Sequence, residues 1–248
     1  MKNSISALAC IAFGLFLTGC SQKKDLFSSE ELKDYVSLAP GKSITYRLDS
    51  LKFQQFGQQE VTISYQAKDV IDAAITDNTG RPAWRVIRYL RDTLGIGPWV
   101  PQSTYMVIQE RETLEVVENN LRFQKLMIPV KDGFMWRGNS HIDTYSVHSD
   151  VRYMDEWDYT YEEVGTAFPV FSGVIENTIT VNQRDEDLGT PNNPDAYSER
   201  NYSKEVYAKG IGLIYKDFVH WVFQPRNSTY PDGYKEGYGI RLRMIEHN

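Results

Sequence analysis

Cysteine is almost absent from this 248-residue sequence, which contains only Cys10 and Cys20. The 228 residues that follow Cys20 therefore contain no thiol. This excludes disulfide bonds and thiolate metal sites from that part of the chain, because both need cysteine sulfur. We expect the fold to be stabilised by a packed core alone, and a chain of this length is long enough to form one.

Clusters of basic residues are also lacking. The chain has 27 basic and 33 acidic residues, which gives a formal net charge of −6. Proteins that bind nucleic acids usually carry a basic patch or stripe, so we do not expect a nucleic-acid partner. For the same reason, we do not expect electrostatic attraction to anionic lipid headgroups.

Recognisable catalytic motifs are missing as well. The sequence has no G-x-S-x-G serine elbow and no two histidines at i, i+4 spacing. Residues 40–43 (PGKS) match only the end of a phosphate-binding loop, because Val36 stands where its first glycine belongs. We assign no catalytic residue, cofactor or metal ligand. A hydrolase stays an alternative, since a glycosidase needs only two carboxylates about 5–9.5 Å apart.

What the sequence does show after residue 43 is alternation of apolar and polar residues. Apolar side chains occupy every second position at 44–48, 61–67 and 240–244, and Asn119-Asn120 has the composition of a tight hairpin turn. This pattern predicts half-buried antiparallel strands. We expect an all-β protein with a curved antiparallel sheet of about ten strands, half-barrel or lipocalin-like. A short helix before Pro40, within residues 28–36, is also expected.

The first 20 residues form a distinct segment. Lys2 precedes an uncharged apolar run at 7–17, and this run continues into Leu17-Thr18-Gly19-Cys20. The four residues resemble the lipobox of bacterial lipoproteins, including many uncharacterised Bacteroidota lipoproteins. The resemblance implies a signal peptide at 1–19 and a diacylglycerol thioether on Cys20, with a palmitate-type chain on its new amino group. Two or more acyl chains anchor a protein stably to a membrane.

By the same resemblance, serine rather than aspartate at position 21 favours the outer membrane of the cell envelope. Residues 20–40 are then a lipidated tether with a short helix, and residues 41–248 form a single β-domain. The stretch 205–215 (EVYAKGIGLIY) resembles a strand-turn-strand unit of half-barrel envelope proteins related to the Lol-type lipoprotein carriers. That likeness implies a half-barrel shape and carries no catalytic residue.

One possible ligand surface lies within 151–164, which we interpret as a strand. From 151 to 161 its odd positions carry Val151, four aromatic residues and a single carboxylate, namely Tyr153, Trp157, Tyr159, Tyr161 and Asp155. In an unbroken strand these side chains share one face, so Asp155 would point to the interior. Aromatic side chains around a single polar group are typical of a pocket for a sugar or a lipid headgroup. The alternative is that the rings pack in the core.

Together these observations predict a membrane-anchored envelope lipoprotein that acts as a non-enzymatic binding or carrier module. Its ligand would be amphipathic or apolar, a glycan, or a protein partner. Two alternatives are kept: a hydrolase that acts on envelope glycans or lipids, and an accessory subunit of an outer-membrane complex that exposes a sheet edge for strand addition.

Overall fold

Twelve antiparallel strands form one continuous sheet in the computed structural model, which describes residues 30–191 and 193–248. Two short 3-10 helices, η1 and η2, complete the secondary structure of this part of the chain. The elements are η1 Leu32–Tyr35, β1 Ser43–Gln54, β2 Gln59–Thr76, β3 Pro82–Arg91, β4 Val100–Gln109, β5 Thr113–Glu118, β6 Leu121–Met127, β7 Met135–Trp136, η2 Arg152–Met154, β8 Tyr159–Val170, β9 Gly173–Gly189, β10 Ser198–Ala208, β11 Gly212–Gln224 and β12 Tyr234–His247.

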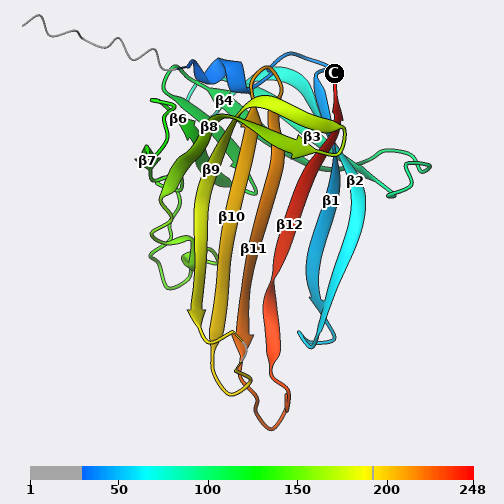
Figure 1. Cartoon of the computed structure of the whole chain (residues 1–248), viewed down its shortest axis with the longest axis vertical. Helices are drawn as coiled ribbons and strands as arrows, with labels where there is room; N and C mark the ends of the chain where they lie inside the picture. Colours follow the sequence, from blue (N-terminus) through cyan, green and yellow to red (C-terminus); the bar gives the residue numbers. More distant parts are fainter. Residues whose placement is uncertain (1–29, 192) are drawn as a thin grey trace, which may run out of the picture.

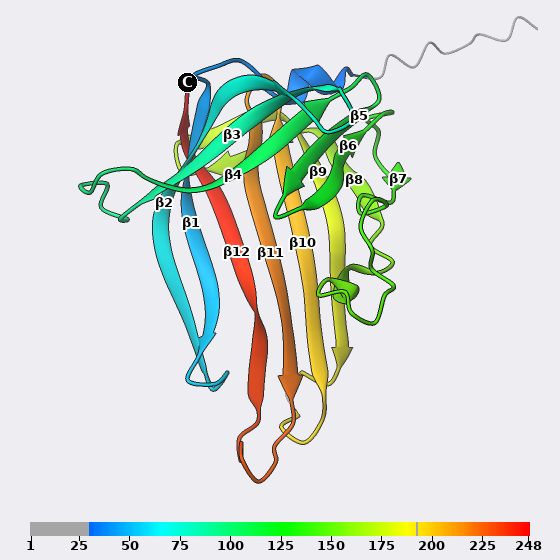
Figure 2. The ribbon, with the colours of Figure 1, turned by 180° about the vertical axis from the view of Figure 1, so that it is seen from behind.

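The strand order is β6-β5-β4-β3-β2-β1-β12-β11-β10-β9-β8-β7, so all neighbouring strands are consecutive in the chain except β1 and β12. The sheet is strongly curved (Figures 1 and 2). Its two edges meet, because the Gln124 amide donates to the Gly138 carbonyl (2.7 Å) and the Trp136 indole donates to the Gln124 carbonyl (2.7 Å). The predicted all-β curved sheet is confirmed, with twelve strands instead of about ten.

Apolar alternation identifies the inner face of this half-barrel. Tyr46 and Leu48 are buried, and the strand register places Tyr46 opposite Ala67 on β2 and Met244 on β12. Directly opposite residues share a face of the sheet, so these side chains point to the same side. The Asn119-Asn120 turn joins β5 to β6 with φ angles of 52° and 63°, as the hairpin prediction requires.

Strands β9–β12, β1 and β2 continue below the closed part as an open sheet (Figure 2). The segment between β7 and β8 packs against its inner face. There the Tyr153 ring stacks on the His220 ring with their centroids 3.6 Å apart. The ring centroids of Trp157 and Phe218 are 6.1 Å apart. We call the end of the sheet that carries η1, the start of β1 and the end of β12 the upper end (Figure 1).

The β8–β9 hairpin folds across the outer face of the sheet. Phe168 packs on Tyr215 of β11, with their ring centroids 5.2 Å apart. The Arg243 guanidinium of β12 lies 4.8 Å from the centroid of the Phe171 ring. Outward-facing residues such as Val206 and Ala208 are therefore fully buried. The upper half of the molecule thus has apolar packing on both faces of the sheet.

Three features of the chain complete the description of the fold. The expected N-terminal helix is the single 3-10 turn η1, while Cys20, the signal peptide and Ser28-Ser29 lie outside the described residues. The polar stretch 184–200 is not one long loop, because β9 runs to Gly189 and β10 begins at Ser198. No helical segment within 30–191 and 193–248 has the length and apolar content needed to cross a bilayer.

Candidate functional site

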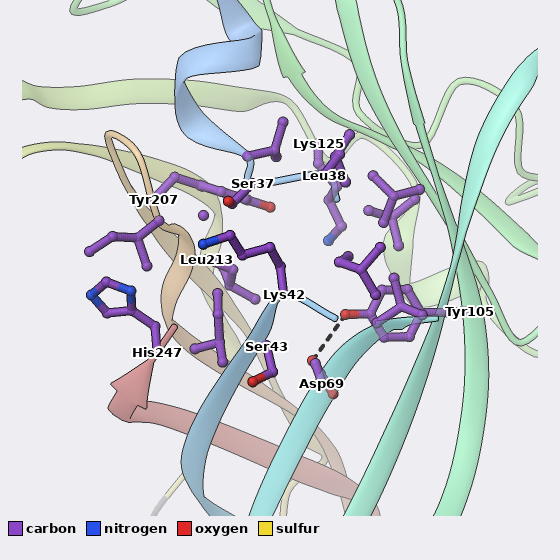
Figure 3. Close-up of a pocket in the computed structure, with 18 of the residues that line it drawn as sticks. Ser37, Leu38, Lys42, Ser43, Asp69, Tyr105, Lys125, Tyr207, Leu213 and His247 are labelled. Carbon is purple, nitrogen blue, oxygen red and sulfur yellow. Dashed lines mark hydrogen bonds between the residues drawn. The ribbon is translucent and has the colours of Figure 1, made fainter. Parts of the chain in front are cut away.

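A pocket occupies the inside of the half-barrel at its upper end. Strands β1–β5 supply one wall, and the β10–β11 turn supplies the other. The segment after η1 and the end of β12 line the mouth, where Lys42 and His247 are exposed (Figure 3). The apolar side chains of this upper pocket are Val36, Leu38, Ile44, Ile71, Val86, Val107, Leu114, Val116, Ile211 and Leu213.

The upper pocket offers about 120 Å³ to the centres of water molecules. One water needs roughly 10–15 Å³ of such space and about 30 Å³ of liquid volume, so the pocket holds about ten waters, or about 300 Å³ of ligand. That is the lower limit for small-molecule pockets. A methylene group is about as large as a water molecule, so one chain of about ten carbons fits.

Six charged side chains form the floor of the upper pocket, and we call this set the charge layer. On β2 and β3, Asp69 and Arg88 are directly opposite in the register. Arg88 donates from Nε to Asp69 Oδ1 (2.7 Å) and from Nη2 to Asp69 Oδ2 (2.6 Å). The Tyr105 hydroxyl also donates to Asp69 Oδ2 (3.0 Å), as Figure 3 shows. The full charge layer is Asp69, Arg88, Glu118, Lys125, Glu205 and Lys216.

Glu205 of β10 is the centre of the second half of the charge layer. Lys125 of β6 donates to Glu205 Oε1 at 2.7 Å, and the Tyr207 hydroxyl donates to Glu205 Oε2 at 2.8 Å. Lys216, opposite Glu205 in the β10–β11 register, places its Nζ 3.6 Å from Oε1. Burial alone would raise the pKa of Glu205, but the two ammonium groups and the tyrosine outweigh it and lower the pKa to about 2.

Glu118 closes the charge layer at the end of β5. Its Oε1 lies 3.8 Å from Arg88 Nη1. Burial would raise the pKa of Glu118, yet the fields of Lys216, Arg88 and Lys125 lower it. Burial and the neighbouring Lys216 lower the pKa of Lys125, although the contact with Glu205 opposes this change. The three carboxylates and three cations give the charge layer a formal charge of zero.

A second cavity lies directly below the charge layer. It offers about 110 Å³ to water centres, and four members of the charge layer line both cavities: Arg88, Glu118, Lys125 and Lys216. The lower pocket is otherwise more aromatic than the upper one. Its rings belong to Phe123, Trp157, Tyr159, Phe218 and Tyr238. The charge layer therefore divides the interior of the half-barrel into two chambers.

The segment 151–164 differs from the predicted strand. Residues 151–158 contain the helix η2 and a turn in which Glu156 has a φ of 56°, and β8 begins only at Tyr159. The placement of Asp155 in the interior was therefore wrong. It is half-buried on a loop, where Arg137 Nη2 (3.1 Å) and the Thr144 hydroxyl (3.0 Å) donate to its Oδ1.

The four predicted aromatic residues are separated by this break. Trp157, Tyr159 and Tyr161 are buried in the main core, and the Tyr161 hydroxyl donates to the Met127 carbonyl at 2.8 Å. Trp157 and Tyr159 also line the lower pocket, whereas Tyr153 covers its side by stacking on His220. Three of the four rings thus pack in the core, as the alternative interpretation of the sequence expected. The role of the four aromatic residues as a ligand surface stays a prediction.

The charge layer was not among the predicted site residues. One signal for it was present in the sequence: Asp69 continues the alternating series Tyr65 and Ala67 on β2 and therefore points inward with them. Glu205 and Tyr207 have the same relation on β10. A charged residue at an inward position of an alternating strand was the signal that could have identified this site.

Comparisons with known proteins do not identify a function for this site. No family model and no curated protein matches the chain. Among solved structures, the chain is similar to a Bacteroides fragilis protein provisionally described as exported and as having a YmcC-like fold. The match has 9% identity and a TM-score of 0.31, and covers 86% of this chain and 99% of the other. A likeness of this degree transfers neither fold nor function.

Proposed function

We propose that the protein is a non-enzymatic binding module of the cell envelope, and that its half-barrel holds the apolar chain of an amphipathic ligand. The observation that supports this proposal is the upper pocket, which has apolar walls, a charged floor and an open mouth. Apolar walls with a few convergent polar groups are the usual composition of small-molecule sites. The volume of the pocket matches one chain of about ten carbons rather than a bulky lipid.

The expected location follows from the lipobox-like residues 17–20. If Cys20 carries the anchor, the nine residues between it and Glu30 span at most about 30 Å. The chain enters the half-barrel through η1, at the same end as the mouth of the upper pocket (Figure 1). A lipid anchor on Cys20 would therefore hold the pocket within reach of the membrane surface. An outer-membrane position stays part of the proposal.

Hydrolysis is supported less well. A glycosidase needs a carboxylic acid that keeps its proton near neutral pH, and so has a raised pKa. In the upper pocket, the pKa values of Glu118 and Glu205 are both lowered. These residues are ionised at neutral pH and cannot protonate a leaving group. Charged groups that are fixed in this way are better suited to recognising a ligand than to transferring a proton.

Strand addition to a partner also has weaker support. The two edges of the sheet are β6 and the two-residue strand β7, and they already face each other. Gln124 of β6 exchanges hydrogen bonds with Gly138 and Trp136 at the other edge. An added strand would have to displace these bonds, because strand addition needs free backbone groups at an edge.

Filling the upper pocket tests the proposal. Val116 points into the pocket from β5, and its neighbour Val117 faces outward. We expect Val116→Trp to weaken binding of a fluorescent C11 fatty acid at least tenfold in a titration, and Val117→Trp, the matched control, to leave it unchanged. Equal binding by both variants, or no binding by the wild-type protein, would contradict the proposal. Circular dichroism and thermal unfolding verify that the variants are folded.

A further inference from the structure

Two members of the charge layer differ from the other four. The side chains of Glu118 and Lys216 form no hydrogen bond within the described part of the chain, and their closest charged partners are 3.8 and 3.6 Å away. Their side chains are 28% and 21% exposed, against 1–13% for the others. Both residues line the upper and the lower pocket. The Glu118 carboxylate, an acceptor, and the Lys216 ammonium, a donor, thus both face the cavities from the charge layer.

The balance of positive and negative charges in the charge layer limits which ligand heads can bind there. The charge layer contains three cations and three anions, and its hydrogen-bonded pairs, Asp69–Arg88 and Glu205–Lys125, neutralise each other internally. A ligand head with a net charge would leave one charge uncompensated at a site of low dielectric, which is strongly unfavourable. A head that carries both signs adds no net charge and can satisfy both unbonded groups.

We propose that Glu118 and Lys216 bind the polar head of the ligand, and that this head is zwitterionic. Its ammonium group contacts the Glu118 carboxylate, and its phosphate or carboxylate contacts the Lys216 ammonium. This inference rests on the proposed function, because it places the apolar chain of the same ligand in the upper pocket. The chain extends from the charge layer toward the mouth, past Val116 and Leu38.

The test compares four ligands that each carry one twelve-carbon chain and differ in the head: dodecyl phosphoethanolamine, dodecyl phosphate, dodecylamine and the monoglyceride of dodecanoic acid. Each displaces the fluorescent C11 fatty acid from the full chain at pH 7, below its micellar concentration. We expect the zwitterion to bind at least tenfold more tightly than the other three. A wild-type protein that binds all four equally would overturn the inference and leave the proposed function intact.

Variants of the two residues give a sharper result, because they change the charge of the layer in opposite directions. Glu118→Gln makes the layer net positive, so the preferred ligand should become dodecyl phosphate. Lys216→Gln makes it net negative, so the preferred ligand should become dodecylamine. The double variant restores neutrality and should lose the preference for the zwitterion. A variant that only lost folding would bind all four ligands more weakly, and the order of their affinities would stay the same.

Matched controls come from two other sites. Glu60 and Lys235 form an exposed ion pair (3.4 Å) that lines neither pocket, so Glu60→Gln and Lys235→Gln should leave the ligand order unchanged. Lys42 lies at the mouth of the upper pocket. If Lys42→Gln, and not Lys216→Gln, weakens dodecyl phosphate and the zwitterion, the head binds at the mouth and the inference is wrong. If the wild-type protein binds neither the fluorescent fatty acid nor, by calorimetry, any of the four twelve-carbon ligands, the proposed function fails first.

Discussion

Glu205→Gln is expected to destabilise the protein more than Lys125→Met, although the two residues form one ion pair. Without the Glu205 carboxylate, Lys125 and Lys216 face each other with no hydrogen-bonded anion between them. Without Lys125, Glu205 still has the Lys216 ammonium 3.6 Å away and accepts a hydrogen bond from Tyr207 at 2.8 Å. The first change leaves the charge layer with one excess positive charge and with two lysines that lose their hydrogen-bonded or nearest anion, whereas the second leaves an anion that still has two partners.

The magnitude can be worked out in two ways. Removing one partner of a buried ion pair costs about 3–5 kcal/mol. Independently, folding lowers the pKa of Glu205 from 4.5 to about 2, which corresponds to about 3 kcal/mol of stabilisation in the ionised form. The side chain is only 1% exposed, so solvent screens this interaction little. For Lys125→Met we expect about 2 kcal/mol, the contribution of one hydrogen bond to a charged group.

The assay is urea unfolding of the wild type and both variants, at pH 7 and then at decreasing pH. A carboxyl group whose pKa is lowered by folding stabilises the protein above its unfolded pKa and loses this contribution as the pH falls toward its folded pKa. The stability difference between the wild type and Glu205→Gln should therefore be largest above pH 4.5. It should shrink by about 3 kcal/mol as the pH falls to about 2.

The matched control is Glu60→Gln, which removes a carboxylate from the exposed pair with Lys235. A surface change of this kind should alter the free energy of unfolding by less than about 0.5 kcal/mol. Two results would refute the reasoning. One is a larger loss of stability for Lys125→Met than for Glu205→Gln. The other is a stability difference for Glu205→Gln that does not change between pH 4.5 and pH 2.

Two further predictions concern the backbone and the anchor. Gly237→Ala should lower the melting temperature by on the order of 10 °C. The reason is that its φ is +135° and a Cβ atom would lie 2.1 Å from the His220 carbonyl oxygen. Gly41→Ala, with a φ of +84° and open space around it, should cost only about 1 kcal/mol. Cys20→Ser should remove the acyl mass in mass spectrometry of the purified protein and move the protein from the membrane to the soluble fraction.

Alternation of apolar and polar residues was sufficient to predict the fold class. Two separate alternating stretches predicted the buried faces of β1 and β12, and in the structure Tyr46 and Leu48 lie opposite Met244 and Leu242. Such patterns are reliable because one face of each strand is buried. They cannot give the strand order, since the pairing of β1 with β12 joins residues about 200 positions apart and depends on the closure of the whole sheet.

The same rule failed at 151–158 for a physical reason. The alternation of aromatic and charged residues there is real, but Glu156 adopts a positive φ and the preceding residues form η2. Trp157 is buried because this loop packs on the inner face of the open sheet. There the ring centroids of Trp157 and Phe218 are 6.1 Å apart. Aromatic side chains are buried equally well from a loop and from a strand. Their spacing alone therefore does not distinguish the two.

The charge layer was predictable only in part. The inward direction of Asp69 follows from Ala67 two residues earlier, so a buried carboxylate on β2 could have been expected. Its partner could not, because Arg88 is opposite Asp69 only in the register of β2 with β3, which contains a bulge between Ile71 and Ala73. The contact of Lys125 with Glu205 crosses the half-barrel from β6 to β10 and exists only in the closed sheet.

The position of the charge layer favours a role in recognition over a role in stability. Replacing a buried ion pair by apolar side chains of similar size is often neutral or stabilising, so ion pairs are a poor way to fill a core. Here the ion pairs lie between two cavities, where the interior is not filled and where the side chains of Glu118 and Lys216 form no hydrogen bond within the described part of the chain. All six groups belong to ion pairs, but the pairs of Glu118 with Arg88 and of Lys216 with Glu205 are longer and contain no hydrogen bond. This arrangement is the basis of the proposal that a ligand head completes the charge layer at Glu118 and Lys216.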